Sequence, residues 1–175
     1  DKGNLKINPI LGGNRSLSYE ISHKLLFKDQ LIKEFATNEL QINSPHLWNL
    51  ETPHLYTLIT TLKTSSGVDL IETKFGFRSL RFEKNGFYLN NQYIKLVGLN
   101  RHQSYPYVGY AMPKGGQEND ADILKHSLGV NIVRTSHYPQ SEHFLNRCDE
   151  IGLLVISEIP GWQYIGKDET WRRHF

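Results

Sequence analysis

The chain has 175 residues, of which 38% are hydrophobic and 11% aromatic, enough to bury the core of one large domain or two small ones. Its 20 Lys and Arg against 18 Asp and Glu are interspersed along the chain and leave a net charge of +2, which argues against a nucleic-acid partner. No apolar run approaches the roughly 20 residues that cross a bilayer, and the single cysteine, Cys148, excludes an intrachain disulfide framework and a multi-thiolate zinc site.

Residues 1–80 have the composition of an antiparallel β-sheet. Four segments are rich in strand-forming residues and bounded by turn residues: 16–21, 25–32, 56–63 and 68–75. Ser65-Ser66-Gly67 supplies the turn between the last two. Several short strands with regular turns predict a small β-sandwich, although Ile32 to Phe35 also fits a helical turn.

Residues 81–96 predict a β-hairpin that leads into a second domain. Two short apolar segments flank Asn90-Asn91, and asparagine tolerates the positive φ angles that a two-residue hairpin turn requires. A two-residue loop at this point pairs Tyr88 with Tyr93 and Phe87 with Ile94. Each face of the hairpin is then consistent, which favours this register.

From Leu96 onward the pattern alternates between strands and helices. Three apolar runs have the length of strands: 96–99, 131–133 and 153–156. Between them we expect one helix that starts at a cap on Asn119 and ends at Gly129, and another that follows Pro139, buries Cys148 and ends at Gly152. The order strand-helix-strand-helix-strand predicts a parallel sheet. A further helix starts near residue 168, and we expect the chain to be part of a longer one.

Polar residues follow each of the three apolar runs, over residues 100–103, 134–139 and 157–163. In parallel α/β architectures, ligands bind beyond the carboxyl ends of the strands. These segments combine hydrogen-bonding side chains, a carboxylate and an indole, and this composition suits a sugar, which presents hydroxyl groups and an apolar ring face. The sequence therefore predicts a carbohydrate site at this edge of the sheet.

The segment Asn131-Ile-Val-Arg-Thr-Ser-His-Tyr-Pro139, followed by Phe144-Leu145 and Asp149-Glu-Ile-Gly152, resembles the signature of glycoside hydrolase family 2. That family includes β-galactosidases, β-glucuronidases and β-mannosidases. Residues 47–56, 76–78 and 98–102 extend the resemblance. It implies a multidomain β plus α/β chain: an immunoglobulin-like β-sandwich over residues 1–80, then a hairpin and the first three βα units of a truncated (β/α)8 TIM barrel over residues 81–175.

The resemblance also implies roles for individual side chains. His102 and His137 match family histidines that hydrogen-bond substrate hydroxyls and assist the oxocarbenium-like transition state, and Arg134 matches an arginine that positions carboxylates. Asn100 is a further candidate contact to the sugar. The alternative for both histidines is a structural role, bonding backbone carbonyls at the mouth of the barrel.

Glu158 aligns with an acidic residue that ends the third strand of the barrel, and its alternative role is to neutralise Arg134. Trp162 fits either a platform for the sugar ring or loop packing. After Glu158, Ile159-Pro160-Gly161-Trp162 departs from the metal-ligand pattern of the magnesium-dependent β-galactosidase in the family. We therefore expect no cofactor and no metal.

Hydrolysis with retention requires two carboxylates about 5 Å apart. In the family both are glutamates on strands four and seven of the barrel, so we expect them outside this chain and expect the chain alone to be inactive. Its uncovered barrel edge predicts self-association, including a homo-oligomer, or low stability.

We expect the parent protein to be a retaining glycoside hydrolase of terminal β-linked sugars, specifically a β-galactosidase. A non-catalytic β-sandwich that binds carbohydrate or docks a partner is the alternative. In the family, the residues that separate galactose, glucuronate and mannose lie largely downstream or in an upstream domain.

Overall fold

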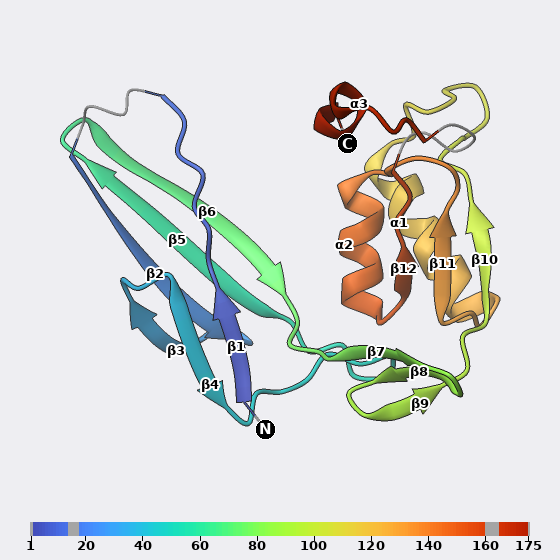
Figure 1. Ribbon diagram of the computed structural model, residues 1–175, viewed down its shortest axis with the longest axis horizontal. Coiled ribbons are helices and arrows are strands. Elements are labelled where there is room, and N and C mark those ends of the chain that lie inside the picture. Colours follow the sequence, from blue (N-terminus) through green and yellow to red (C-terminus); the bar gives the residue numbers. More distant parts are fainter. Residues whose placement is uncertain (1, 14–17, 160–164, 175) are drawn as a thin grey trace. The chain divides into compact units, whose positions relative to one another are not determined.

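The computed structural model in Figure 1 describes residues 2–13, 18–159 and 165–174. The chain divides into two compact units. The first consists of Asp1–Trp48 and His54–Arg78, and the second of Asn49–Pro53 and Ser79–Phe175. No helix in the described part of the chain is long and apolar enough to span a membrane.

The first unit is a β-sandwich, as predicted. Its strands are β1 (Lys2–Lys6), β2 (Tyr19–Phe27), β3 (Gln30–Phe35), β4 (Glu39–Asn43), β5 (Tyr56–Thr64) and β6 (Gly67–Phe75). The antiparallel sheet β3-β2-β5-β6 packs on the pair β1-β4. Buried Leu25 and Tyr56 of the larger sheet share one apolar cluster with Leu5 of β1 and Leu40 of β4. Burial of these alternating positions stabilises the two-layer arrangement.

Two details of the predicted sandwich were wrong. β2 is one continuous strand, because Tyr19–Phe27 pairs with β5 along its whole length. The chain reverses at Lys28 and Asp29, whose φ angles are 49° and 62°, so no strand runs through residues 25–32. Ile32 to Phe35 belongs to strand β3 and not to a helical turn. The ladder with β2 overrides the local pattern there.

The second unit begins with β7 (Leu80–Glu83), β8 (Gly86–Leu89) and β9 (Gln92–Ile94), an antiparallel sheet. The predicted hairpin is confirmed: Tyr88 pairs with Tyr93 and Phe87 with Ile94. Asn90 and Asn91 have φ angles of 50° and 67°, as a two-residue turn of this kind requires.

The remainder of the second unit is the predicted βαβαβ arrangement. Its elements are β10 (Gly98–Arg101), α1 (Lys114–Asp122) with a π-helical turn (Ile123–Ser127), β11 (Ile132–Thr135), α2 (Glu142–Ile151), β12 (Leu154–Ile156) and α3 (Glu169–His174). The parallel strands lie in the order β10-β11-β12, and Figure 1 shows α1 and α2 beside them. Val133, Phe144 and Cys148 are at most 1% exposed in the core between sheet and helices.

The first helix and the first strand of this arrangement start elsewhere than predicted. α1 begins at Lys114, with Pro113 as its cap, and Asn119 lies inside the helix. The backbone N–H of Gln117 donates to the carbonyl of Pro113, which closes the first turn. β10 begins at Gly98 because its ladder pairs Gly98 with Ile132, so the apolar run 96–99 is only half strand.

Candidate functional site

The predicted site residues lie at the carboxyl ends of the parallel strands. β10 ends at Arg101, β11 at Thr135 and β12 at Ile156, so His102, His137 and Glu158 follow the strands within two residues. Arg134 is in register with Asn100 on one side and Ile156 on the other. Paired residues of neighbouring strands share a face, so Asn100 and Arg134 lie on the same side of the sheet.

Arg134, His137 and Glu158 form a polar cluster, which we call the strand-end cluster. Arg134 Nη2 donates to Glu158 Oε1 at 2.5 Å, and His137 Nδ1 lies 3.2 Å from Glu158 Oε2. Arg134 Nη2 also lies 3.2 Å from His137 Nδ1. The backbone N–H of Glu158 donates to the Thr135 hydroxyl at 3.1 Å, which fixes the carboxylate-bearing segment against β11. Glu158 is distant from Arg134 and His137 in the sequence, and the parallel pairing of β11 with β12 brings the three side chains together.

His102 extends the strand-end cluster with an aromatic surface. Its ring centroid is 5.4 Å from that of His137, at an interplanar angle of 79°. Tyr138 is 6.0 Å from His102 and 5.5 Å from Tyr110 by the same measure. His102 is exposed, whereas His137 and Tyr138 are half-buried. Imidazole nitrogens and aromatic faces therefore border the charged pair, a combination that binds hydroxyl groups and apolar ring faces.

The electrostatics of the strand-end cluster keep Glu158 ionised. Its partial desolvation opposes the charged form, but hydrogen bonds and positive charge from Arg134 and His137 outweigh it and lower the pKa of the Glu158 carboxyl. In the tautomer with the proton on Nδ1, His137 donates a charge-assisted hydrogen bond to the ionised Glu158. If Nδ1 carries the proton and Nε2 does not, Nε2 of His137 is a hydrogen-bond acceptor.

The other two predicted contacts have different outcomes. Asn100 is exposed on β10, in register with Arg134, so it lies on the sheet face that carries the cluster. Trp162 lies outside the described residues. That the six predicted residues contact a sugar remains a prediction.

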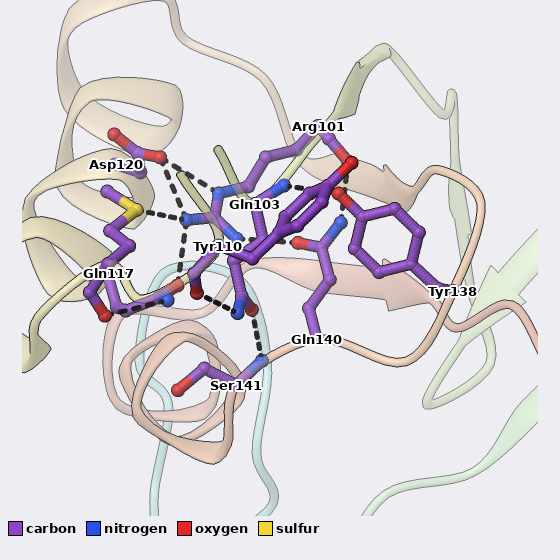
Figure 2. A network of polar contacts seen from close by, with 9 residues as sticks. Arg101, Gln103, Tyr110, Gln117, Asp120, Tyr138, Gln140 and Ser141 are labelled. Carbon is purple, nitrogen blue, oxygen red and sulfur yellow. Dashed lines mark hydrogen bonds and ion pairs between the residues drawn. The ribbon is translucent and has the colours of Figure 1, made fainter. Parts of the chain in front are cut away.

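Arg101 is a residue to which the sequence interpretation gave no role. Its side chain is 5% exposed, and it donates to Asp120, Gln117 and Gln140 as Figure 2 shows. It lies on the helix-covered face, where it stacks on Phe144 at 4.0 Å from the ring centroid. The sequence does contain a signal for this role: Arg101 lies in the polar segment that follows the apolar residues of a strand that helices cover. A charged side chain on a covered strand face must be paired, so partners for Arg101 were to be expected.

Within the described residues, no three or more His, Cys, Asp and Glu side chains gather as a metal ion would require. Glu158 is engaged by Arg134 and by Nδ1 of His137. The sequence-based expectation that no metal binds remains a prediction.

A β-sandwich joined to a parallel βαβαβ unit with polar strand ends is the architecture of a sheet domain followed by the start of a TIM barrel. The model of glycosyl hydrolases family 2 matches residues 8–78, and the model of that family's TIM barrel domain matches residues 80–169. The chain belongs to this family of glycosidases, which confirms the predicted family and fold class.

Curated relatives and solved structures agree with this assignment. The chain is 54% identical over 147 residues to a β-galactosidase of Thermoanaerobacterium thermosulfurigenes, covering 84% of the chain and 20% of the relative. It is 52% identical over 136 residues to a β-galactosidase of Thermoanaerobacter pseudethanolicus, covering 77% of the chain and 18% of that relative. The crystal structure of a Parabacteroides merdae β-glucuronidase matches with a TM-score of 0.78 at 30% identity, covering 89% of the chain and 21% of that protein. The chain thus spans about a fifth of the length of the relatives it matches.

Proposed function

We propose that the protein carrying this chain is a retaining glycosidase of terminal β-linked sugars, specifically a β-galactosidase, and that the chain supplies one wall of its sugar site. The observation that carries this proposal is the convergence of Arg134, His137 and Glu158, with the His102 ring 5.4 Å from His137. A paired carboxylate, two imidazoles and aromatic rings at the carboxyl ends of parallel strands suit a pyranose.

Each side chain has a distinct role in this proposal. His137, with its proton directed to Glu158, accepts a hydrogen bond from a sugar hydroxyl through Nε2. His102 contacts a neighbouring hydroxyl. The ionised Glu158 stabilises the positive charge that develops on the sugar ring in the oxocarbenium-like transition state. Arg134 holds the carboxylate in place, so that little reorganisation is needed during reaction.

The groups that break the glycosidic bond come from elsewhere in the longer protein. A general acid must carry a proton near neutral pH, whereas Arg134 and His137 lower the pKa of Glu158 and keep it ionised. Retention also needs a second carboxylate about 5 Å from the first. We therefore expect the chain by itself to bind sugar weakly and to hydrolyse none.

Two observations support galactose over glucuronate. The two curated relatives described above are named β-galactosidases, at 54% and 52% identity. In addition, a glucuronide would bring its own carboxylate, which requires a cation, and the arginine of the strand-end cluster is already paired with Glu158. A neutral sugar imposes no such demand.

The test compares aryl β-galactoside, β-glucuronide and β-mannoside as substrates of the purified full-length protein. We expect the highest kcat/KM for the galactoside, and we expect His102→Ala and His137→Ala each to lower it at least about tenfold. His143→Ala is the matched control, because His143 is exposed on α2. A preference for the glucuronide would contradict the assigned sugar. Sugar binding without hydrolysis of any substrate would support the binding-module alternative instead.

A further inference from the structure

We propose that Arg101 and Gln103 are positioning residues that fix the two histidine-bearing loops against each other, an inference that rests on the proposed function of His102 and His137. The loops in question follow β10 and β11. Hydrogen bonds between Arg101 or Gln103 and residues 136–141 connect them, and we call this set the loop brace. Figure 2 shows the bonds to Tyr138, Gln140 and Ser141.

The guanidinium of Arg101 anchors the brace in the interior of the unit. It donates through Nε to Asp120 Oδ2 at 3.0 Å and through Nη2 to Gln117 Oε1 at 2.8 Å, both on α1. Nη1 donates to Gln140 Oε1 at 2.6 Å, beyond β11. A planar guanidinium presents its donors in fixed directions, which the ammonium of lysine does not. Arg101 therefore sets where α1 and the β11 loop lie relative to the end of β10.

The carbonyl of Arg101, directly before His102, is also fixed. It accepts the Gln140 side-chain amide at 2.6 Å and the backbone N–H of Ser136 at 3.0 Å. Ser136 directly precedes His137. One hydrogen bond therefore joins the backbone immediately before one histidine to the backbone immediately before the other.

Gln103 connects the same loops on the other side of His102. Its backbone N–H donates to the Tyr138 hydroxyl at 3.0 Å, and its side-chain Oε1 accepts the backbone N–H of Ser141 at 2.6 Å. Each histidine is thus flanked on both sides by residues of the brace: His102 by Arg101 and Gln103, His137 by Ser136 and Tyr138.

The hydrogen bonds of the brace described above involve no imidazole of His102 or His137. The brace holds the backbone and leaves the rings to face the strand-end cluster, with 5.4 Å between their centroids. A displacement of about 1 Å between groups that contact one substrate costs up to about 100-fold in rate. The separation of the two rings is therefore the quantity that Arg101 and Gln103 control.

Gln103→Ala in the purified full-length protein tests the inference, because Gln103 is half-buried and uncharged and its loss should leave the fold intact. We expect kcat/KM for an aryl β-galactoside to fall about tenfold or more, mostly through kcat, with the thermal midpoint nearly unchanged.

Three further variants check the same inference. Gln103→Glu keeps the acceptor for the Ser141 N–H and should therefore retain most of the parent's activity. Tyr138→Phe, which removes the acceptor for the Gln103 N–H, should reproduce the loss. Arg101→Lys should lower kcat/KM more than Gln103→Ala does. If the Arg101→Lys protein does not fold, the results for Gln103→Ala and Tyr138→Phe test the inference in its place.

A double-mutant cycle separates positioning from a general structural effect. In a His102→Ala background, Gln103→Ala should lower kcat/KM less than about twofold further, because its effect acts through His102. An equal loss in both backgrounds, or no loss in either, would overturn the inference.

A crystal structure of the Gln103→Ala protein makes the outcome independent of activity. A changed separation of the His102 and His137 rings supports positioning, and an unchanged separation overturns it. If the rings move while His102→Ala leaves hydrolysis unaffected, the positioning role holds and the proposed function fails.

Discussion

Arg134 of β11 and Glu158, two residues beyond β12, form an ion pair with 2.5 Å between Nη2 and Oε1. His137 joins this pair through Nδ1, 3.2 Å from Oε2. The three residues come from two neighbouring strand ends, so the pair depends on the parallel register that aligns Arg134 with Ile156. The arrangement couples the position of a histidine to the ionisation of a carboxylate.

The first prediction concerns the pKa of Glu158. Partial desolvation opposes its ionisation, but Arg134 and His137 together lower its pKa, so Arg134→Gln should raise it. A carboxyl with a lowered folded-state pKa contributes stability above its unfolded pKa of about 4.3, and this stability is lost as pH falls through the folded pKa. The variant should therefore lose less stability than the parent as the pH falls below about 4.3. Carboxyl ¹³C NMR titration and urea unfolding at acidic pH measure both effects.

Lys95→Gln is the control for this titration, since Lys95 is exposed and precedes β10 at the opposite end of the strand. It should leave the pKa of Glu158 unchanged. An Arg134→Gln protein with the same Glu158 titration as the parent would show that the ion pair does not form in solution.

The second prediction concerns His23, which is fully buried in the sandwich. Its Nδ1 lies 3.0 Å from the Thr60 hydroxyl, and within the described residues its Nε2 has no hydrogen-bond partner. Burial lowers the pKa of His23. Below the unfolded pKa of about 6.5 the unfolded chain takes up a proton that the folded chain does not. Stability should therefore fall with pH below about 6.5, by at most about 1.4 kcal/mol per pH unit from this residue.

His23→Gln should reduce that slope in urea unfolding between about pH 7 and pH 5. His143→Gln, at an exposed position of α2, is the matched control and should keep the slope. An identical pH dependence in the His23 variant and the parent would mean that His23 gains a proton in the folded state as readily as in the unfolded state.

Local chemistry predicted much of the fold. The hairpin followed from Asn90 and Asn91, and the end of α2 followed from Gly152, whose φ angle is 74°. The start of α1 did not follow, because Gly115 and Gly116 have low helix propensity and conceal the first turn. A Cβ on Gly116 would lie 2.9 Å from Met112 Cε, so close packing, which no local pattern reveals, accounts for this glycine.

The same contrast holds for the candidate site. The rule that ligands bind at the carboxyl ends of parallel strands placed the three polar segments at one edge of the sheet. The family resemblance then singled out His102, His137 and Glu158 within them. The loop brace could not be predicted, since the partners of Arg101 come from α1 and from the loop beyond β11. Such contacts depend on tertiary packing and leave no periodic signal in the sequence.

The third prediction concerns Gly152, where left-handed backbone and close packing coincide. A Cβ there would lie 2.4 Å from the Leu50 carbonyl oxygen, which accepts a hydrogen bond from Lys125 Nζ at 2.8 Å. Gly129 also has a positive φ, 66°, but its Cβ would meet no atom within 4 Å. Gly129→Ala should therefore cost about 1–2 kcal/mol from its backbone alone, and Gly152→Ala at least about 1 kcal/mol more from the displaced segment. Urea unfolding of both variants measures this difference in stability. Equal losses of stability would show that the Leu50 carbonyl does not lie close against Gly152.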